Sequence, residues 1–353
     1  MHGNRLNEKI SSFYNGRKVF VTGHNGFKGS WMCKVLADLG AEVCGLSLPC
    51  ADHSPFGSMK LRNVRSIGGD VGDTEGTADA LSSFGPEVVI HMAAQPLVLE
   101  SYKDPVGTYM TNVMGTVNVL DAARKCPTVT SVVNVTTDKV YRNLERSEGY
   151  REDEALDGHD PYSNSKSCSE LVTASYRRSF FADVPVSTCR AGNVIGGGDR
   201  SKDRIVPDCV RAAERKETII LRNPGSVRPY QHVLEPICAY LLLAAEQSAD
   251  RELAGSYNIG PDDESAITTQ KLAELFCGNW KGAEWKAPGR NEGPHEAGIL
   301  RLNCDKFKRT FDWKPRWKIE EAVGRTVDWY LAERDGKDMS VFTAEQIKDY
   351  LEQ

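Results

Sequence analysis

The chain has 353 residues, of which 40% are hydrophobic and 26% are charged, and its formal net charge at pH 7 is −5. This composition is typical of a soluble globular protein with one large domain or two moderate ones. The mild acidity excludes the broad basic surface of a nucleic-acid-binding protein, and no apolar run approaches the roughly 20 residues that span a bilayer. Residues 1–15 lack the apolar core of a signal peptide, so we expect a cytoplasmic protein with no nucleic-acid or membrane partner.

The ten cysteines and seven histidines are scattered along the chain. No CxxC or HExxH motif occurs, and most cysteines lie in apolar stretches, such as Cys33 and Cys189. A buried, unpaired cysteine behaves as a small hydrophobic residue. We therefore predict structural thiols and no metal site.

Strand-like and helix-like segments alternate through the first half of the chain. The predicted strands are 17–22, 41–46, 64–67, 86–91, 129–135 and 184–190, and the predicted helices are 27–39, 106–125 and 162–181. Such alternation predicts an α/β fold with a doubly wound parallel sheet of the Rossmann type.

The character of the chain changes after Arg190, where a glycine-rich stretch begins and the predicted strands become short and separated by loops. We predict a Rossmann domain over residues 1–192, with a helix near 233–262 that returns to the sheet. Residues 193–353 are then expected to form mainly a smaller, interleaved C-terminal substrate domain.

A glycine-rich turn, Thr22-Gly23-His24-Asn25-Gly26-Phe27-Lys28-Gly29, separates the first predicted strand from the first predicted helix. Glycines at this spacing form a tight turn, let the backbone approach a pyrophosphate, and let the helix pack on the strand. The helix N-terminus also favours phosphate groups. A plain strand–helix turn is the alternative, but the flanking elements favour a dinucleotide site.

Two more predicted strands end in residues that suit a dinucleotide. Asp70 follows the third strand, where its carboxylate either accepts a hydrogen bond from an adenine amino group or caps the next helix. Ala93-Ala94-Gln95 follow the fourth strand, and their small side chains leave room for a cofactor. The end of the second strand, 45–48, carries neither an acid for a ribose hydroxyl nor an arginine for a 2′-phosphate, so this position leaves NAD and NADP both open.

Tyr162 and Lys166 are four residues apart in a predicted helix, so they lie on one face, one turn apart. A phenol has a pKa near 10, and a lysine cation together with an oxidised nicotinamide would favour the phenolate. Tyr162 could then take a proton from a substrate hydroxyl. A surface Tyr/Lys pair is the alternative, but together with the glycine turn the pair indicates short-chain dehydrogenase/reductase chemistry.

Thr137, Asp138 and Lys139 end the fifth predicted strand, at the edge of the sheet where ligands collect. A threonine there can hydrogen-bond the reacting hydroxyl. Simple oxidoreduction needs no further acid or amine, so Asp138 and Lys139 suggest an elimination as well. A salt bridge within the turn is the alternative.

These motifs resemble those of the extended short-chain dehydrogenases/reductases that act on nucleotide sugars. The segments that carry the resemblance are 21–31, 91–98, 137–139, 160–166, 190–199 and 228–236, and the likeness runs from about residue 14 to at least residue 317. The glycine turn and the Tyr/Lys pair occur throughout that superfamily. The CDP-glucose branch of the 4,6-dehydratases is similar at three further places: Asp138-Lys139, Gly-Gly-Gly-Asp at 196–199 and Arg-Pro-Tyr-Gln-His at 228–232. Most other branches carry Asp-Glu where this chain has the dyad Asp138-Lys139.

The resemblance implies NAD as cofactor, CDP-glucose as substrate and CDP-4-keto-6-deoxyglucose as product. It implies that Tyr162 deprotonates the C4 hydroxyl as hydride passes to NAD, that Asp138 is the acid for loss of the C6 hydroxyl, and that hydride returns to C6. Lys139 would act at the C5 step, either as a base of lowered pKa or as a cation that stabilises the C4 enolate.

A nucleotide-sugar 4-epimerase or another sugar-nucleotide dehydrogenase/reductase is the competing enzyme, and Asp138-Lys139 argues against the epimerase. A non-catalytic dinucleotide sensor is the competing protein of another class. A sensor would tolerate loss of Tyr162 or Lys166, and both residues are present.

The resemblance also implies which residues act on, or hold, the two ligands. The catalytic set is Thr137, Asp138, Lys139, Tyr162 and Lys166. The cofactor set is Gly23, His24, Gly26, Phe27, Lys28, Gly29, Asp70, Val71, Ala93, Ala94, Gln95, Asn112, Tyr162 and Lys166. The substrate set is Gln95, Thr137, Asn193, Arg204, Arg228 and His295.

Within the substrate set, Arg228 suits a diphosphate through bidentate hydrogen bonds, and a surface ion pair is its alternative. Family members pair through the helices that here begin near Pro105 and Tyr162, which implies a homodimer or a homotetramer.

Overall fold

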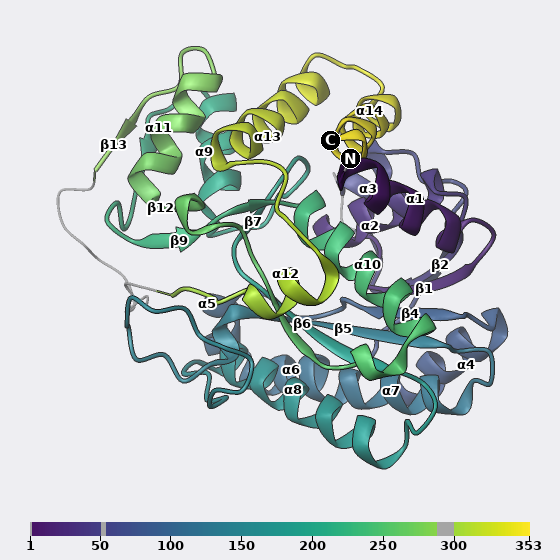
Figure 1. Ribbon diagram of the computed structural model, residues 1–353. Helices are drawn as coiled ribbons and strands as arrows, with labels where there is room; N and C mark the ends of the chain where they lie inside the picture. Colours follow the sequence, from purple (N-terminus) through teal and green to yellow (C-terminus); the bar gives the residue numbers. More distant parts are fainter. Residues whose placement is uncertain (1, 51–53, 288–299) are drawn as a thin grey trace.

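The described residues of the computed structural model, 2–50, 54–287 and 300–353, form a seven-stranded parallel sheet flanked by helices (Figure 1). The strand order is β11-β6-β5-β4-β1-β2-β3, and every pairing within this sheet is parallel. The strands are β1 (Lys18–Thr22), β2 (Glu42–Ser47), β3 (Arg65–Gly68), β4 (Val88–His91), β5 (Ser131–Thr137), β6 (Val186–Ala191) and β11 (Ser256–Ile259). The predicted doubly wound parallel sheet and its six predicted strands are confirmed.

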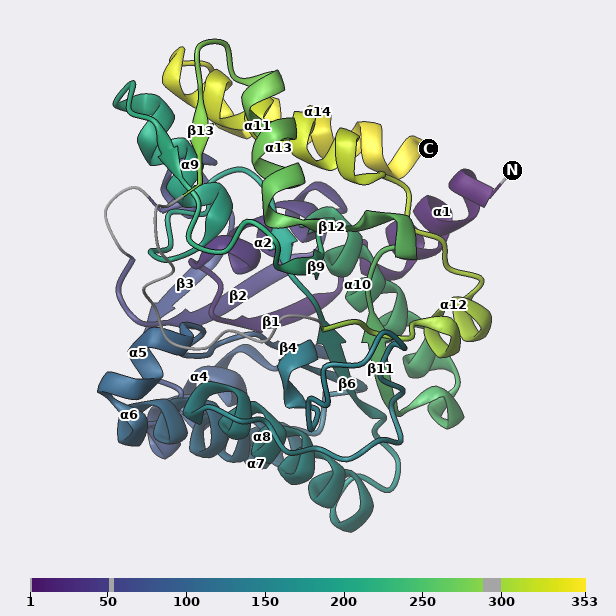
Figure 2. The ribbon, with the colours of Figure 1, turned by 90° about the vertical axis from the view of Figure 1, so that its left-hand side faces the viewer.

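Helices cover both faces of the sheet, so both sides of each central strand are buried, as in β1, where Phe20 faces one apolar cluster and Val19 and Val21 face the other. One face carries α4 (Thr74–Phe84), α5 (Val98–Lys103), α6 (Pro105–Tyr109), α7 (Gly115–Lys125) and α8 (Pro161–Ser179) (Figure 2). The opposite face carries α1 (His2–Tyr14), α2 (Phe27–Asp38), α3 (Pro55–Ser58), α10 (Leu234–Ala249) and α14 (Met339–Glu352).

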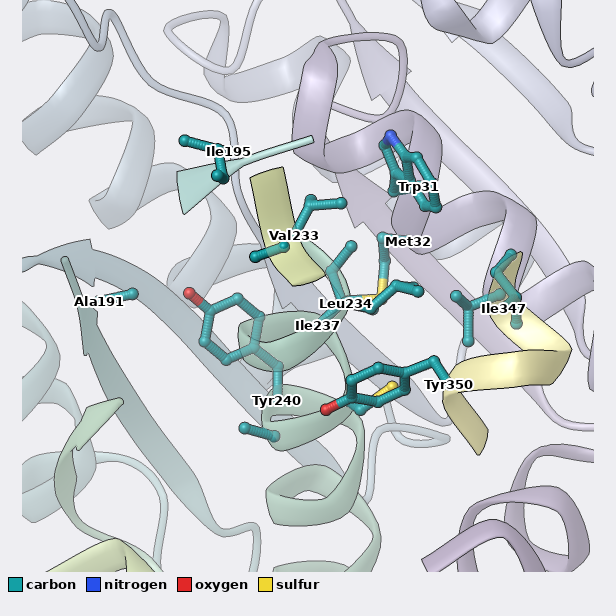
Figure 3. Close-up of a cluster of buried hydrophobic side chains, with 14 of the residues drawn as sticks. Trp31, Met32, Ala191, Ile195, Val233, Leu234, Ile237, Tyr240, Ile347 and Tyr350 are labelled. Carbon is teal, nitrogen blue, oxygen red and sulfur yellow. The ribbon is translucent and has the colours of Figure 1, made fainter. Parts of the chain in front are cut away.

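The core on the second face joins segments that are far apart in the sequence. Figure 3 shows Trp31 of α2, Tyr240 of α10 and Tyr350 of α14 around one cluster of apolar side chains. All three rings are fully buried. The C-terminal helix therefore packs directly on the helix that follows the glycine turn and on α10.

The helix predicted over 106–125 is interrupted. It consists of α6, a π-helical turn η1 (Met110–Met114) and α7. A π turn inserts one extra residue into a helix and often marks a functional position. Met110 and Met114 of this turn are exposed, as is Val106 of α6, whereas Asn112 is buried.

The remaining elements lie mostly beyond the carboxyl ends of the strands (Figure 1). Three two-stranded sheets pair β7 (Val194–Ile195) with β10 (Gln231–His232), β9 (Val227–Pro229) with β12 (Ala266–Thr268), and β8 (Ile219–Ile220) with β13 (Trp285–Lys286). The helices are α9 (Ile205–Glu214), α11 (Thr269–Asn279), α12 (Asp305–Phe311) and α13 (Ile319–Arg334), with short helical turns η2 (Asp138–Val140), η3 (Arg251–Leu253) and η4 (Asp263–Ser265).

The chain returns to the main sheet after this excursion, because α10 packs behind β5 and β11 pairs with β6. The assignment of residues 1–192 to one domain and 193–353 mainly to another stays a prediction. Among the helices that the structure describes, none has the length and apolar character needed to cross a membrane.

Candidate active site

The site lies at the carboxyl edge of the sheet, at the point where the strand order reverses. β1 is paired with β2 on one side and with β4 on the other, so the crossovers run in opposite directions from it. In open α/β sheets, ligands bind at this switch point. The glycine turn follows β1, residues 93–95 follow β4, and the dyad of Asp138 and Lys139 follows β5.

Two of the three glycines in the turn, Gly23 and Gly29, leave no room for a side chain. Gly23 has a φ of 72°, and a Cβ there would lie 2.9 Å from the Ala93 backbone. A Cβ on Gly29 would overlap the Gly23 carbonyl, whereas one on Gly26, the N-cap of α2, would meet that carbonyl at an ordinary 3.5 Å. A narrow backbone cradle at a helix N-terminus fits the pyrophosphate of a dinucleotide.

We expect Gly29→Ala and Gly26→Ala to separate the two roles of these glycines. Gly29→Ala forces α2 away from the turn, so both the melting temperature and NAD affinity should fall. Gly26→Ala should keep a melting temperature close to that of the wild type, since its Cβ meets no backbone closely, while NAD binding weakens by roughly tenfold or more as the methyl group obstructs the phosphates. Calorimetric NAD titrations and thermal melts would check both variants. Equal NAD affinity in the Gly26→Ala protein and the wild type would place the pyrophosphate elsewhere.

His24 lies under the turn, against β2 and β3. Its Nε2 is 2.7 Å from Ser66 Oγ, and its ring fills the space that a Cβ on Gly45 would occupy. Burial lowers the pKa of the His24 imidazole. The ring therefore packs at the edge where an acidic residue would otherwise bind a ribose, and it does not point along the phosphate cradle.

The next two residues of the turn reach toward the carboxyl edge of the sheet. The Phe27 ring packs where a Cβ on Gly196 would lie 3.2 Å from it. Lys28 is half-buried, with its ammonium 6.0 Å from the centre of the Tyr240 ring. Burial, followed by the nearby cations Arg204 and Lys166, lowers the pKa of Lys28 to about 8.

Asp70 and Val71 have different surroundings. The exposed Asp70 accepts a hydrogen bond from the Gly72 amide at 2.8 Å, and the N-cap of α4 is Asp73, so the capping alternative for Asp70 is wrong. Val71 is buried beneath α7, and its carbonyl accepts a hydrogen bond from Asn118 at 2.8 Å. Asp70 remains available to a ligand at the edge of the sheet.

Asn112 holds the loop after β4 in place. Its side chain accepts from the Gln95 amide at 2.8 Å, and donates to the Gln95 carbonyl at 3.1 Å and to Ser165 Oγ at 2.9 Å. The Gln95 side chain is tied within its own loop, because it donates to Thr108 Oγ1 at 2.9 Å and accepts from the Leu97 amide at 2.6 Å. Ala93 and Ala94 precede this anchored residue and leave the edge of the sheet uncrowded.

Tyr162 stands at the start of α8, which Asp160 caps by accepting from the Ser163 amide at 3.0 Å. The phenol is buried, and burial raises its pKa, while the Lys139 cation, a hydrogen bond with Thr137 and the Arg204 cation act in the opposite direction. We predicted Lys166 as the cation near this phenol, and the cations whose charges act on the phenol are Lys139 and Arg204. The Lys166 ammonium instead donates to the Val135 carbonyl at 2.9 Å.

The dyad occupies the short turn η2. Asp138 Oδ1 accepts from Thr137 Oγ1 at 2.9 Å and from Lys139 Nζ at 3.1 Å. Asp138 is 1% exposed, and its Oδ2 has no hydrogen-bond partner among the residues that the structure describes. Gly192 leaves space beside this oxygen, because a Cβ there would lie 3.5 Å from it. Oδ2 is therefore the oxygen that can hold or deliver a proton.

Three of the expected substrate residues, Asn193, Arg204 and Arg228, lie in the segments that follow β6. Arg228, in β9, is 9% exposed, which argues against a surface ion pair, and it donates to the Val227 carbonyl at 2.9 Å. Asn193 follows β6, where its carbonyl accepts from the Gln231 amide at 3.0 Å. Arg204 directly precedes α9, and its guanidinium lies 3.2 Å from the buried carboxylate of Asp199. His295 lies outside the described residues.

Two residues near the site were missed from the sequence. Asp199 orients Arg204, and the Gly-Gly-Gly-Asp segment that contains it was a signal for this position. The buried hydroxyl of Tyr240 has no hydrogen-bond partner within the described part of the chain and lies beside Lys28. Nothing in the apolar helix around Tyr240 signals that position.

Comparisons with known proteins agree with this geometry. Residues 19–260 match the model of the NAD dependent epimerase/dehydratase family. The chain is 43% identical to the CDP-glucose 4,6-dehydratase of Salmonella typhimurium, over 96% of this chain and 98% of that protein. It is 32% identical to the dTDP-glucose 4,6-dehydratase of Streptomyces antibioticus, over 77% of each.

Solved structures with the same fold include enzymes of two activities. The dTDP-glucose 4,6-dehydratase of Bacillus anthracis in complex with NAD has a TM-score of 0.76 at 21% identity, with 92% of this chain and 100% of that chain covered. The UDP-glucose 4-epimerase of Thermus thermophilus in complex with NAD has a TM-score of 0.76 at 26% identity, with 89% and 99% covered.

Proposed function

This chain belongs to the NAD-dependent epimerase/dehydratase family, and we propose that it is a hydro-lyase that converts CDP-glucose to CDP-4-keto-6-deoxyglucose. NAD is its cofactor, which the lack of an acid after β2 left open. The glycine cradle, Lys28, Lys166 and the loop that Asn112 anchors are the residues that would hold NAD. When bound, NAD would accept a hydride from C4 of the sugar and later return it to C6.

One observation carries the proposal. A buried carboxylate oxygen without a partner, Asp138 Oδ2, and an ammonium, Lys139 Nζ, stand beside the Thr137 hydroxyl and the Tyr162 phenol. An epimerase needs only the last two groups to remove and return hydride at C4. The additional acid and cation support an elimination at C5 and C6 of the same sugar.

The first step requires a base at the C4 hydroxyl. Tyr162, in its phenolate form, is placed to take this proton. The Lys139 and Arg204 cations stabilise that phenolate. Thr137 can share a hydrogen bond with the phenol and with the substrate oxygen. The sugar loses one proton and one hydride at C4 and becomes a 4-ketone.

The ketone makes the C5 proton acidic, and elimination then removes that proton and the C6 hydroxyl. Asp138 Oδ2 gives its proton to the departing hydroxyl, so that water leaves, and the carboxylate formed in this way takes the C5 proton. Hydride arrives at C6 as Asp138 returns the proton to C5, and the proton that Tyr162 took then restores Asp138. The net change is the loss of one water with no net reduction of NAD.

Of the two roles left open for Lys139, the structure favours that of a cation. Its Nζ donates to Asp138 Oδ1 at 3.1 Å, and its side chain is 32% exposed, so its hydrogens point into the site as donors. We infer that Lys139 stabilises the C4 enolate and the Tyr162 phenolate.

Lys139→Arg and Lys139→Met are expected to behave differently. Arginine keeps the positive charge but does not deprotonate in proteins, so Lys139→Arg should retain a substantial part of the turnover. Methionine keeps the length and removes the charge, and turnover should fall by roughly 10²–10³-fold. Steady-state rates of product formation, measured for both variants, distinguish a cation at Lys139 from a base. Equal loss in the two variants would instead identify Lys139 as a base.

We propose a homodimer or homotetramer that pairs through the face of α6 and α8. A shallow apolar cavity there is lined by Pro105, Val106, Tyr109, Met110, Val113 and Met114, and Leu171 of α8 is also exposed. Apolar patches of this kind commonly mark protein interfaces. A cytoplasmic location is also proposed, and the ten unpaired cysteines support a reducing compartment.

The substrate is tested by supplying NAD with CDP-glucose, UDP-glucose, dTDP-glucose or CDP-galactose and recording product mass. We expect loss of one water from CDP-glucose at a rate well above those of the other nucleotide sugars. Interconversion of CDP-glucose and CDP-galactose at constant mass would favour the 4-epimerase. No change in any of the four would favour a non-catalytic sensor.

A further inference from the structure

The last residues of β1 and β4 are polar, and their side chains meet. Thr22 and His91 are register partners in the sheet, and they are 0% and 1% exposed. Thr22 Oγ1 lies 2.7 Å from His91 Nδ1. The two strands lead directly into the two segments that would hold NAD, the glycine turn and residues 93–95. Buried polar atoms are normally hydrogen-bonded, so the partners of this pair show which elements it joins.

The hydrogen bonds around Thr22 determine the tautomer of His91. Thr22 Oγ1 accepts from the amides of Met92 and Ala93, both at 3.1 Å. A hydroxyl oxygen has two lone pairs and one hydrogen. Because the two amides occupy both lone pairs, the Thr22 hydrogen points to His91 Nδ1, which must then be an acceptor. The His91 ring therefore carries its hydrogen on Nε2.

The Nε2 hydrogen joins His91 to the helices on one face of the sheet. Thr116 Oγ1 of α7 lies 3.2 Å from Nε2 and donates its own hydrogen to the Asn112 carbonyl at 2.7 Å. The Ser169 hydroxyl of α8, 2.9 Å from Thr116 Oγ1, can then act only as a donor to it. Both ring nitrogens of His91 are thus hydrogen-bonded, one to a strand end and the other to a helix.

Asn112 extends this network to the loop after β4 and to the helix that carries the candidate base. Its side chain holds the Gln95 amide at 2.8 Å and the Gln95 carbonyl at 3.1 Å, and it donates to Ser165 Oγ at 2.9 Å. Ser165 Oγ donates to the Tyr162 carbonyl at 2.7 Å. A continuous series of contacts therefore runs from Thr22, beside the cofactor cradle, to the backbone of Tyr162.

The surroundings of the His91 ring keep it neutral. Its nitrogens meet two hydroxyls, and neither meets a carboxylate. Burial, followed by the nearby Lys166 cation, lowers the pKa of His91 to about 3. A neutral ring is also what the hydrogen bonds require, because a protonated ring would direct a second hydrogen at the Thr22 hydroxyl, whose lone pairs are already occupied.

We propose that His91 is a positioning residue of the cofactor site: with its hydrogen on Nε2, it locks the glycine turn and the loop after β4 to each other and to the helix that carries Tyr162. Gly23 shows how closely the two segments must fit, because a Cβ there would lie 2.9 Å from the Ala93 backbone. His91 acts through Thr22 and Thr116 and not through contact with a ligand. This role rests on the proposed function only in that Tyr162 is its base.

The tautomer is measured by NMR in protein labelled with ¹⁵N-histidine, without ligand and without an activity assay. The His91 signals are those that are missing from the spectrum of His91→Asn. We expect hydrogen on Nε2 and an unprotonated Nδ1 at neutral pH. A ring that carries its hydrogen on Nδ1, or that is charged at neutral pH, would overturn the proposal.

Calorimetric titrations of NAD measure the positioning itself. His91→Leu removes both hydrogen bonds of the ring, whereas His91→Asn keeps an oxygen that can accept from Thr22 and is too short to reach Thr116. NAD should bind His91→Leu more weakly than the wild type by roughly tenfold or more, and His91→Asn by an intermediate factor. Affinity for CDP, titrated in the same samples, should stay within about threefold, because the expected substrate residues follow β6.

Gln247→Met is the matched control. Gln247 of α10 is fully buried and joins the amino ends of β5 and β6, since it donates to Ser131 Oγ at 2.8 Å and accepts from Ser187 Oγ at 2.5 Å. These contacts lie at the edge of the sheet opposite the site. Gln247→Met should lower the melting temperature and leave NAD affinity unchanged.

A second pair of variants serves if His91→Leu fails to fold. Thr116→Val removes only the hydroxyl that His91 Nε2 meets, and NAD binding should weaken severalfold. Thr116→Ser keeps that hydroxyl and should bind NAD as the wild type does. Equal NAD affinity in Thr116→Val and Thr116→Ser would count against the positioning role.

The outcomes for His91 and for the proposed function are separable. NAD affinity within about threefold of the wild type in folded His91→Leu would overturn the proposal. So would an equal loss of NAD affinity in Gln247→Met, because any destabilised sheet would then bind NAD poorly. Weakened NAD binding in His91→Leu alone, with no binding of CDP to the wild-type protein, would support the role of His91 and contradict the proposed substrate.

Discussion

Tyr162→Phe is expected to abolish most of the chemistry while leaving cofactor binding nearly unchanged. The phenol oxygen is the group placed to take the C4 proton, and general base catalysis contributes roughly 10²–10⁴-fold. Phenylalanine retains the ring that packs at the start of α8, so the local fold should survive. After CDP-glucose is added, the absorbance of reduced nicotinamide is followed in a single turnover. It should rise more slowly than in the wild type, by roughly 10²–10⁴-fold.

The control for this variant is Tyr176→Phe. Tyr176 lies on the same helix, is only partly buried, and packs on Phe180 with ring centroids 5.1 Å apart. The Tyr176→Phe variant should reduce the cofactor at the wild-type rate. An NAD dissociation constant within about threefold of the wild type in both variants would show that binding is intact. Wild-type turnover in Tyr162→Phe would refute the assignment of the base.

Asp138→Asn is expected to separate oxidation from elimination. Asparagine keeps the shape of the side chain and can still accept from Thr137, but it cannot deliver a carboxylic proton. Oxidation at C4 depends on Tyr162 and should survive in part. Loss of the C6 hydroxyl should slow by roughly 10²–10⁴-fold, so reduced cofactor should accumulate after CDP-glucose is added.

The buried Asp199 gives the control for that variant. It pairs with Arg204 at 3.2 Å but is not hydrogen-bonded to Thr137 or Lys139. Asp199→Asn should weaken substrate binding by misplacing Arg204, and it should not cause reduced cofactor to build up. If Asp138→Asn forms dehydrated product at the wild-type rate with no reduced intermediate, the dyad is structural and the epimerase interpretation regains support.

The fold was predictable because its strongest signals are periodic and local. Each central strand is a short apolar run buried on both faces, and each is followed by an amphipathic helix, so the alternation determines a parallel sheet. Strand β11 was not predicted, because Ser256–Ile259 is a short segment whose place beside β6 depends on the return of α10. The π turn at Met110–Met114 was missed for a similar reason, since the same residues also suit a continuous helix.

The candidate site was predictable where the chemistry is carried by a motif, as with the glycine turn and the Tyr162–Lys166 pair. It was not predictable where a contact joins distant parts of the chain. The sequence separation of 20 residues between Glu170 and Arg190 gives no hint of their ion pair. That the Lys139 charge acts on the Tyr162 phenol also follows from the tertiary arrangement and not from spacing.

The measurement that tests the central claim most directly uses CDP-glucose labelled with deuterium at C4. The protein, NAD and this substrate are incubated together, and the product is isolated and examined by mass spectrometry and NMR. The account predicts CDP-4-keto-6-deoxyglucose with the deuterium at C6, because the hydride removed from C4 returns to the same sugar, and it predicts no net reduced cofactor. Deuterium that remains at C4 in an epimerised sugar, or that appears in free reduced cofactor, would contradict it.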